Sequence, residues 1–498
     1  MGQFHFAVPS DSTQLLKQTL WKDAYICGIE GVPWECKNSV DGGILSISRP
    51  VDTSGKLYLT CPTKGLGYRT LSTCSLMPHE RPHPLYLELA RGSCYRAREQ
   101  SSNWERAGLA LGDRFGELVA RGTAQFLDAA EARGDLEECS RHALQAIATL
   151  EQAIADLGES FALQSIAYRK QREPQLGTLL AGSVFPPAPT RSPLSRRFES
   201  AFNCAAVRLN WGTIESDAGR FEFEASDRTI HWCGERGLRV LAGPLVDFRK
   251  ELMPPWLYLI EDNFDSFLQS VTQYTQRVVE RYRGSVQLWN CAAGLNTPGP
   301  VALDDEQVMR LAVAILQTVR RIDPNTPAII SFDQPFGEYL AKHRDGISAL
   351  HFADALARSG LGMAGIGLDV RLNYARDATL PRSALDFGQM IDRWATLGLP
   401  MLVQLTIPGG CGEDEKAIAK QSTLMTGTDR VELSANQLRT AGPIVRTLLA
   451  KQVVHGIVWD GWADNEKHVQ SHAGVIDSLG APRPMLDYFE RLRHELLA

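Results

Sequence analysis

The sequence predicts an α/β protein whose larger part is a (β/α)8 TIM barrel, preceded by a β-sandwich-like domain and a helical hairpin. Three observations lead to this prediction: short β-rich runs near the start, two long helical stretches after them, and repeated strand–helix units up to the last residues. At 498 residues the chain exceeds one simple core, so we expect several domains. The predicted domains are residues 1–98, 99–175 and 176–498.

Composition and charge indicate an ordinary globular protein. The chain is 44% hydrophobic and 22% charged, with a net charge of −6. There is no basic block, so we expect no nucleic-acid partner, and no run of about 18 apolar residues, so we expect no membrane span. The start lacks a signal-peptide pattern, which predicts a cytoplasmic location.

The cysteines and the Gly-rich stretches do not indicate a metal or a cofactor. The ten cysteines form no CxxC pair, and the stretch HWCGERG has no second ligand at metal spacing. The stretch GLGMAGIG at 360–367 precedes a β-rich run instead of following one, unlike a dinucleotide-binding loop. We therefore expect neither a metal nor a cofactor, and the oligomeric state stays open.

Residues 1–98 carry short apolar runs separated by turn residues. GGILSISRP, KLYLTCP and LYLELARG alternate or are β-rich. A jelly-roll of the carbohydrate-binding kind fits this pattern, and so do other small β folds.

The next region changes to helical spacing. WERAGLALGDRFGELVARGTAQFLDAAEA and LEECSRHALQAIATLEQAIADLGESFALQSIAYRKQ repeat apolar residues every three to four positions. The Gly and Asp of EARGDLEE mark a helix end and a helix start. Two long antiparallel helices follow from this pattern.

From about residue 177, β-rich runs alternate with helical patterns. The predicted strands are VLAGPLV, SVQLWN, AIISF, GIGLDVRL, MLVQLTI and GIVWDGW. The predicted helices are DRTIHWCGERG, FLQSVTQYTQRVVERYRG, DEQVMRLAVAILQTVRRID, ALDFGQMIDRWATLG and ELSANQLRTAGPIVRTLLAKQ. Repeated units of this kind predict a parallel barrel. The stretch LGTLLAGSVFPPAPTRSPLSRR before them is interpreted as a turn-rich linker.

This part of the chain resembles glycoside hydrolase family 10, the β-xylanase family, over residues 200–495. The resemblance rests on six stretches in the family's order: FNCAAVRLNWGTIESDAGRFEF, PLVDFRKELMPPWL, RYRGSVQLWN, AGIGLDVRL, GLPMLVQLTI and HGIVWDGWAD. It implies a barrel and a carbohydrate partner, either a polysaccharide or an oligosaccharide. The region before the barrel is not matched.

Active sites of such barrels lie at the C-terminal ends of the strands. Asp247, Asp369 and Asp460 each directly follow an apolar run, and two of them could act as acid and base, so they are the candidate catalytic residues. The candidate substrate-binding residues are Arg208, Asn210, Trp211, Trp256, Asn290, Asp333, Arg371, Gln404, Trp462 and Asp464. The tryptophans would offer faces to a sugar, although each suits a core equally well, and Asp and Arg at strand ends often pair with each other.

The resemblance does not extend to the family's chemistry. Retaining glycosidases need two carboxyl groups about 5–5.5 Å apart. Gly294 stands where the family has its acid/base Glu, and Leu405 stands where it has its nucleophile. No Glu or Asp lies in 285–303 or in 395–412, so a small shift of the match restores neither group.

Three functions remain open at this stage. The first is a family 10-like protein that binds a glycan without retaining xylanase activity. The second is an active glycoside hydrolase on another saccharide that uses the relocated aspartates. The third is a scaffold that acts through the N-terminal β and helical regions. Fold alone does not choose between them.

Overall fold

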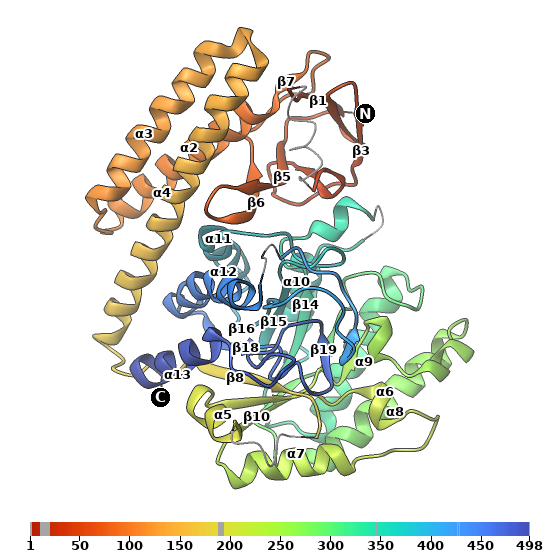
Figure 1. Cartoon of the computed structure of the whole chain (residues 1–498). Helices are drawn as coiled ribbons and strands as arrows, with labels where there is room; N and C mark the ends of the chain where they lie inside the picture. Colours follow the sequence, from red (N-terminus) through yellow and green to blue (C-terminus); the bar gives the residue numbers. More distant parts are fainter. Residues whose placement is uncertain are drawn as a thin grey trace. The chain divides into compact units, whose positions relative to one another are not determined.

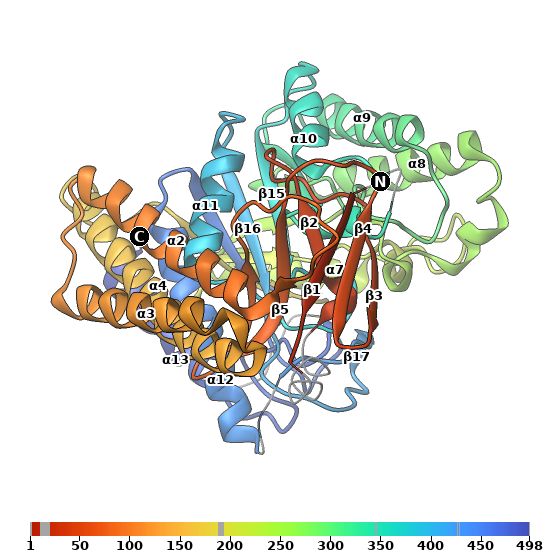
Figure 2. The same cartoon turned by 90° about the horizontal axis from the view of Figure 1, so that it is seen from above.

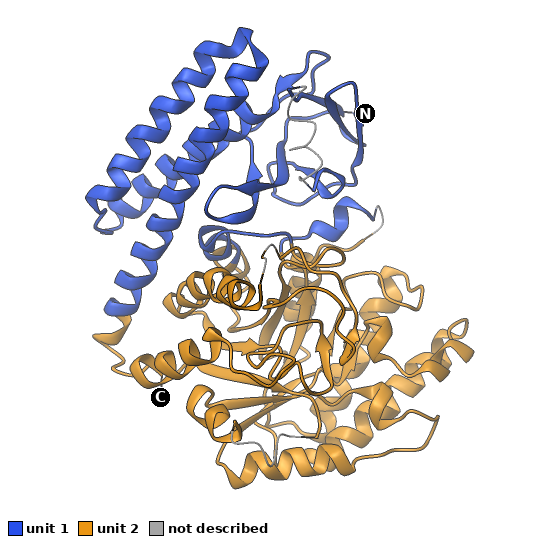
Figure 3. Ribbon diagram, in the orientation of Figure 1, with its two compact units in different colours: residues 1–168, 336–345, 380–390 blue, residues 169–335, 346–379, 391–498 orange. Residues whose placement is uncertain are grey.

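The computed structural model describes residues 2–9, 20–187, 194–343, 346–425, 427 and 429–497. The chain divides into two compact units, coloured separately in Figure 3. Unit 1 consists of residues 1–168, 336–345 and 380–390, and unit 2 of residues 169–335, 346–379 and 391–498. Within the described ranges, every helix is too short or too polar to cross a lipid bilayer.

Unit 1 contains the predicted β-rich region as two small sheets (Figures 1 and 2). One sheet has the strand order β3-β4-β1-β7 and the other β2-β5-β6. The strands are β1 (Gly2–Ala7), β2 (Tyr25–Cys27), β3 (Lys37–Asp41), β4 (Ile44–Arg49), β5 (Lys56–Thr63), β6 (Gly67–Ser72) and β7 (His83–Pro84). The turn from β3 to β4 is Gly42–Gly43, with φ angles of 52° and 77°, because this hairpin turn needs positive φ at both positions.

Three long helices follow these sheets in the sequence, as Figure 1 shows: α2 (Leu85–Arg106), α3 (Asp113–Glu131) and α4 (Leu136–Lys170), which belong to unit 1 up to residue 168. The second predicted helix is confirmed as α4. The first is wrong in its extent, because α2 ends before Gly108 and α3 begins only after Gly112. Gly108 has a φ of 99°, a conformation that a continuing helix does not allow.

The stretch LYLELARG forms the start of α2, so its interpretation as β-rich is wrong. Its leucines alternate along the sequence as they would in a strand. However, Tyr86, Glu88 and Ala90 between them are buried as well. A helix enclosed on all sides has no polar face, so its sequence lacks the 3.6-residue pattern that would reveal it.

Unit 2 is built on a closed barrel of eight parallel strands in the order β8-β9-β10-β12-β14-β15-β16-β18, with β18 pairing back to β8. The strands are β8 (Leu179–Val184), β9 (Cys204–Val207), β10 (Arg239–Ala242), β12 (Leu288–Asn290), β14 (Ala328–Asp333), β15 (Gly365–Arg371), β16 (Met401–Thr406) and β18 (Val454–Trp459). The predicted fold class, a (β/α)8 barrel, is confirmed. The linker interpretation is wrong for LLAGSV, which forms strand β8. This run is short and a Pro-rich stretch follows it, so its sequence did not indicate a strand.

Helices follow the strands of the barrel. They are α5 (Ser195–Ala201), the single turn α6 (Trp211–Ile214), α7 (Glu224–Glu235), α8 (Phe264–Tyr282), α9 (Asp305–Ile322), α10 (Ala349–Arg358), α11 (Ala384–Ala395), α12 (Arg430–Ala450) and α13 (Pro484–Leu496). All five predicted helices of this region are confirmed. Polar capping residues stabilise the N-termini of two of these helices. At α9 the Asp304 side chain accepts a hydrogen bond from the backbone N–H of Gln307, and at α8 the Asn263 side chain accepts one from the backbone N–H of Ser266.

Two pairs of short strands extend the barrel beyond the C-terminal ends of its strands. Strand β11 (Val246–Asp247) follows β10 and pairs in parallel with β13 (Ala292–Ala293), which follows β12. In the same way, β17 (Ala417–Ala419) follows β16 and pairs with β19 (His468–Gln470), which follows β18. These extensions hold the loops at the mouth of the barrel in place.

Candidate ligand site at the barrel mouth

The inward-facing side chains of the barrel change from apolar to polar along the strands. An apolar cluster in the interior contains Ala181, Cys204, Ala206, Leu241, Ile329, Leu402 and Val458. Side chains alternate along a strand, so the inward positions continue two residues at a time toward the C-terminal ends. At those ends they are Ser183, Arg208, Asn290, Asp333, Asp369, Arg371, Gln404, Thr406 and Asp460. We call this set, with Asp247 and Arg249 of the β11 extension, the mouth residues.

Arg208 joins two of the predicted catalytic aspartates. Its Nη2 and Nε donate to the carboxylate of Asp460 at 2.8 and 3.2 Å, and its Nη1 donates to Oδ2 of Asp247 at 3.3 Å. Asp247 also accepts from Arg249, whose Nε lies 2.8 Å from Oδ1 and whose Nη2 binds Oδ2. The Thr406 hydroxyl donates to Asp460 Oδ2 at 3.2 Å. The structure therefore brings Asp247 and Asp460 together around one guanidinium.

These ion pairs keep both carboxylates charged. Burial by itself would raise the pKa of Asp247, but Arg249 and then Arg208 outweigh it and lower that pKa below its usual value. Burial acts in the same direction on Asp460, and the same two guanidinium groups lower its pKa as well. At neutral pH both side chains are therefore anions that already have cationic partners.

Asp369 has the opposite electrostatic environment. It is in register with Asp333 on β14 and with Gln404 on β16. Arg371 is directed to Asp333, where its Nη2 donates to Oδ2 at 3.1 Å. Burial, followed by the charge of Asp333, raises the pKa of Asp369 to about 7, although Arg249 and Arg371 act against this shift. Asp369 is thus a carboxyl group that exchanges its proton near neutral pH.

Four buried polar atoms of the mouth have no hydrogen-bond partner among the described residues. They are Oδ1 of Asn290, Oδ1 of Asp333, Oδ1 of Asp369 and Nη1 of Arg249. A buried polar atom without a partner costs about 1–3 kcal/mol, so such atoms normally bind water or a ligand. The mouth of the barrel is therefore suited to accept polar atoms from outside the chain.

The predicted tryptophans lie in aromatic clusters. Trp211 is 2% exposed and stacks on Tyr274 with ring centroids 5.0 Å apart, and the ring of Trp256 meets it edge-on. Trp462 is 6% exposed and packs edge-on against Phe198. For Trp211 and Trp462 this corrects the expectation of a sugar-stacking face, because protein side chains cover their rings. Trp256 is partly exposed, and its Nε1 donates to the Glu215 carbonyl.

Two further predicted residues, Asn210 and Asp464, have no contact with the ion pairs of Arg208 among the hydrogen bonds described above. Asn210 precedes the single turn α6, where its Oδ1 accepts from the Thr213 hydroxyl at 3.0 Å. Asp464 binds Arg483 at 2.6 Å and accepts from the Gly474 backbone N–H at 2.7 Å. Asn210 therefore has a local structural partner, and Asp464 belongs to a different cluster from Arg208.

Two positions correspond to the catalytic glutamates of the family. One has a backbone conformation that suits glycine, and the side chain of the other is directed away from the barrel interior. Gly294 has a φ of 76°, a conformation that residues with a Cβ rarely adopt. Leu405 alternates with the inward Gln404 and is in register with Trp459, whose ring packs on Phe489 of α13. Leu405 therefore faces the surrounding helices, and Gln404 is the residue of this strand end that faces the interior.

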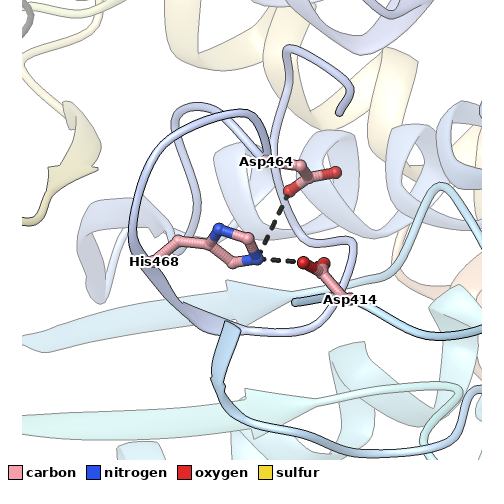
Figure 4. A group of neighbouring side chains, drawn as sticks. All are labelled: Asp414, Asp464 and His468. Carbon is pink, nitrogen blue, oxygen red and sulfur yellow. Dashed lines mark hydrogen bonds and ion pairs between the residues drawn. The ribbon is translucent and has the colours of Figure 1, made fainter. Parts of the chain in front are cut away.

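Sequence reasoning missed a second polar cluster beside the mouth, drawn in Figure 4. Nε2 of His468 lies 3.0 Å from Oδ2 of Asp414 and 3.9 Å from Oδ1 of Asp464. Burial would raise the pKa of Asp414, but hydrogen bonds from His468 and from the His472 backbone N–H lower it to about 2. Asp414 and His468 lie far apart in the sequence, so no short motif connects them. Their proximity could have been inferred only from the strands that they follow, β16 and β18, which are neighbours in the barrel.

A small pocket separates this cluster from Arg208. It is lined by side chains from β8, β9 and the β18–α13 loop, among them Ser183, Arg208, Asp460, Trp462, His468 and Gln470. Its volume of about 30 Å³ exceeds the roughly 10–15 Å³ that a cavity needs to hold one water molecule. It therefore accommodates a water molecule or a single ligand oxygen.

Comparisons with known proteins show what the chain is similar to. The model of glycosyl hydrolase family 10 matches residues 176–295. Among solved structures, xylanase 10B from Thermotoga petrophila RKU-1 in complex with xylobiose is 15% identical, covers 66% of this chain and 94% of its own, and has a TM-score of 0.48. Native xylanase 10B from Thermotoga maritima is 14% identical, with 65% and 97% coverage and a TM-score of 0.49. No curated protein sequence matches the chain.

The matched segment runs from just before β8 to the loop after β13, which is the part that carries Arg208, Asp247 and Asn290. The region before the barrel has no counterpart in this match. Residues 176–295, which form the first strands of the closed parallel barrel in unit 2, are thus similar to glycosyl hydrolase family 10.

Proposed function

We propose that the mouth of the barrel binds a carbohydrate and that the chain lacks the two-glutamate hydrolysis of the xylanase family. The observation that carries this proposal is the group of unpaired buried atoms on Asn290, Asp333, Asp369 and Arg249. A sugar hydroxyl both donates and accepts hydrogen bonds. Adjacent hydroxyl groups of one ring therefore suit three oxygen atoms on neighbouring strand ends and the NH2 group of the Arg249 guanidinium beside them.

The lack of retaining hydrolysis rests on the two family positions. Gly294 has no carboxyl group, and Leu405 is directed away from the interior. Two of the carboxylates that face the mouth are engaged, because Asp247 and Asp460 share Arg208. A nucleophile held in two charge-assisted hydrogen bonds is a poor attacking group, because those bonds must weaken before it reacts.

One observation favours a second candidate, a glycoside hydrolase with relocated acids. The pKa of Asp369 is raised while those of Asp247 and Asp460 are lowered. Carboxyl groups with pKa values shifted in opposite directions are typical of acid and base pairs. In this candidate Asp369 protonates the leaving oxygen, and one of the ionised aspartates activates water.

Isothermal titration calorimetry of the full chain tests the binding proposal. The ligands are xylobiose and xylohexaose, chosen from the family match, followed by a panel of other oligosaccharides. We expect one saccharide class to bind, and the variants Asn290→Ala and Asp333→Asn to weaken it at least about tenfold. The first removes an unpaired acceptor, and the second replaces the unpaired acceptor by an NH2 donor while the retained oxygen accepts from Arg371, and each change is worth about 1–3 kcal/mol. Asp265→Asn is the control, because that side chain is 87% exposed on α8.

An assay of reducing-sugar release on the same panel separates the two candidates. Binding without release supports the first. Release that both Asp369→Asn and Asp460→Asn abolish, and that Asp265→Asn leaves unchanged, supports the second. If no saccharide of the panel binds or reacts, the carbohydrate proposal is wrong for this barrel.

A further inference from the structure

Three buried side chains at the barrel mouth present ligand atoms to one point. They are Asp414 in the loop after β16, and Asp464 and His468 in the loop after β18, and their ligand atoms all lie within 4.8 Å of one another. Two atoms bound to one Zn²⁺ at tetrahedral angles are about 3.4 Å apart, given bonds of about 2.1 Å. The observed distances from His468 Nε2 to the two carboxylates, 3.0 and 3.9 Å, lie on either side of that value.

The orientation of the imidazole is the one that metal-binding histidines have. Nδ1 of His468 lies 2.8 Å from the carbonyl oxygen of Glu466. A carbonyl only accepts, so Nδ1 carries its hydrogen there, and Nε2 is directed to both carboxylates, as Figure 4 shows. A histidine that binds a metal commonly donates its second ring N–H to a carbonyl in this way.

The two carboxylates are held by partners of their own. Arg483 Nη1 lies 2.6 Å from Oδ2 of Asp464, and the Gly474 backbone N–H donates to Oδ1 at 2.7 Å. The His472 backbone N–H donates to Oδ2 of Asp414 at 2.8 Å. Such outer contacts fix the direction of metal-binding carboxylates. Arg483 is thus a permanent cation beside the two anionic groups of the cluster.

Gln470 supplies an independent sign of a ligand. It is 2% exposed, and neither its amide oxygen nor its amide nitrogen has a hydrogen-bond partner within the described part of the chain. It lies two residues after His468 on β19, so both side chains are on the same face of that strand. Both also line the water-sized pocket beside Arg208. An unpaired buried amide at this place indicates a bound water or ion that the chain does not itself provide.

We propose that Asp414, Asp464 and His468 bind a divalent transition-metal ion of the Zn²⁺ type, with a water molecule in the adjacent pocket as a further ligand. One imidazole and two carboxylates suit Zn²⁺ or Mn²⁺ better than Ca²⁺ or Mg²⁺, which prefer oxygen ligands alone. The three ligands come from two loops, so the ion would fasten the β17 and β19 extensions together. This site does not depend on saccharide binding at the mouth.

Calorimetry and X-ray absorption on the chelator-treated full chain test the proposal, with ZnCl₂ and MnCl₂ as probes and CaCl₂ and MgCl₂ as comparisons. We expect one equivalent of Zn²⁺ to bind. Loss of an outer contact alone weakens metal sites by about 10–100-fold, so we expect Asp464→Asn and His468→Gln each to weaken binding at least about 100-fold. Two controls should bind as the wild type does: Cys411→Ser, which removes the exposed thiol near Asp414, and His455→Gln on β18.

The absorption spectrum of the Zn²⁺-loaded wild type keeps the test decisive if a variant fails to fold. We expect oxygen and nitrogen neighbours at about 2.0–2.2 Å with one imidazole and no sulfur. Absence of Zn²⁺ binding, a sulfur neighbour, or unchanged binding by a folded His468→Gln variant would each overturn the proposal. The cluster would then be an ion-paired support of the two loops.

Discussion

Asp369 on β15 and Asp333 on β14 are paired in register, so two carboxyl groups occupy adjacent inward positions of the barrel. Both are almost fully buried, at 2% and 1% exposure. Two negative charges this close in an environment of low polarity are unfavourable, so one of the groups retains its proton to a higher pH. Arg371 donates to Asp333, which leaves Asp369 as the group that keeps the proton.

The first prediction is a change in how stability depends on pH when Asp369 is replaced by Asn. The pKa of Asp369 is about 7 in the folded chain against a usual value of 3.8. Between these values the folded state holds a proton that the unfolded state has lost. The free energy of unfolding of the wild type therefore falls as pH rises, by up to about 1.4 kcal/mol per pH unit. The Asp369→Asn variant lacks this contribution.

Urea unfolding at pH values from 4 to 8, followed by tryptophan fluorescence, measures this difference. We expect the stability of Asp369→Asn relative to the wild type to increase up to about pH 7 and then to level off. Asp265→Asn should give a flat difference, since its side chain is 87% exposed. A flat difference for Asp369→Asn as well would mean that folding does not shift the pKa of Asp369.

A second prediction concerns the guanidinium that Asp247 and Asp460 share. In Arg208→Met, Asp460 keeps the Thr406 hydroxyl but loses both hydrogen bonds from its cation. Removing one member of a buried ion pair costs about 3–5 kcal/mol, because a charge is left buried without compensation. We expect a loss of this size in the free energy of unfolding at pH 7.

Two comparisons check that explanation. Arg310→Met removes an exposed pair with Asp265 at 3.5 Å, and such pairs contribute only about 0–1 kcal/mol. The double variant Arg208→Met/Asp460→Asn should recover part of the loss, because the uncompensated charge is gone. If the double variant is less stable than Arg208→Met alone, charge burial is not the reason for the loss.

The sequence predicted the barrel and much of its mouth for a physical reason. An apolar run that ends in Asp or Arg marks the C-terminal end of a buried strand, and parallel strands bring those ends together. Asp247, Asp369 and Asp460 were found in this way, and Arg208 with them. Residue spacing does not predict that Arg208 pairs with Asp460, or Arg371 with Asp333, because these partners follow or lie on different strands.

Other features depend on contacts that leave no local pattern. Trp211 follows a strand end like the polar candidates, and only the packing of Tyr274 against its ring shows that it is core. Asp414 and His468 come from two separate loops, and their contact exists only after β17 has paired with β19. Helix α2 was missed at its start because burial on all sides removes helical periodicity.

A third prediction separates the core role of Trp211 from a sugar-binding role. Its Nε1 donates to Glu215 at 2.8 Å, and its ring is covered. We expect Trp211→Ala to lower the free energy of unfolding by about 3–5 kcal/mol, as for other large buried aromatic residues. Tyr258→Ala, at 38% exposure, should change it by no more than about 0.5 kcal/mol. A stable Trp211→Ala variant that binds saccharide more weakly would restore the sugar-stacking role.

The last prediction addresses why no acid stands at position 294. A Cβ at this position would lie 3.6 Å from atoms of Phe248, an ordinary contact, so space is not the obstacle. The obstacle is the φ of 76°, which costs a residue with a Cβ about 1–2 kcal/mol. We expect Gly294→Ala and Gly294→Glu to lower the free energy of unfolding by that amount in urea titrations. Gly234→Ala, at an unstrained position in α7 with open space around it, should raise it by about 0.4–1 kcal/mol.

Because Gln404 faces the interior where a second carboxylate would be needed, we expect no xylan hydrolysis from Gly294→Glu. Sugar release by that variant, or a stability equal to that of the wild type, would show that the backbone at this strand end still accommodates the family's acid.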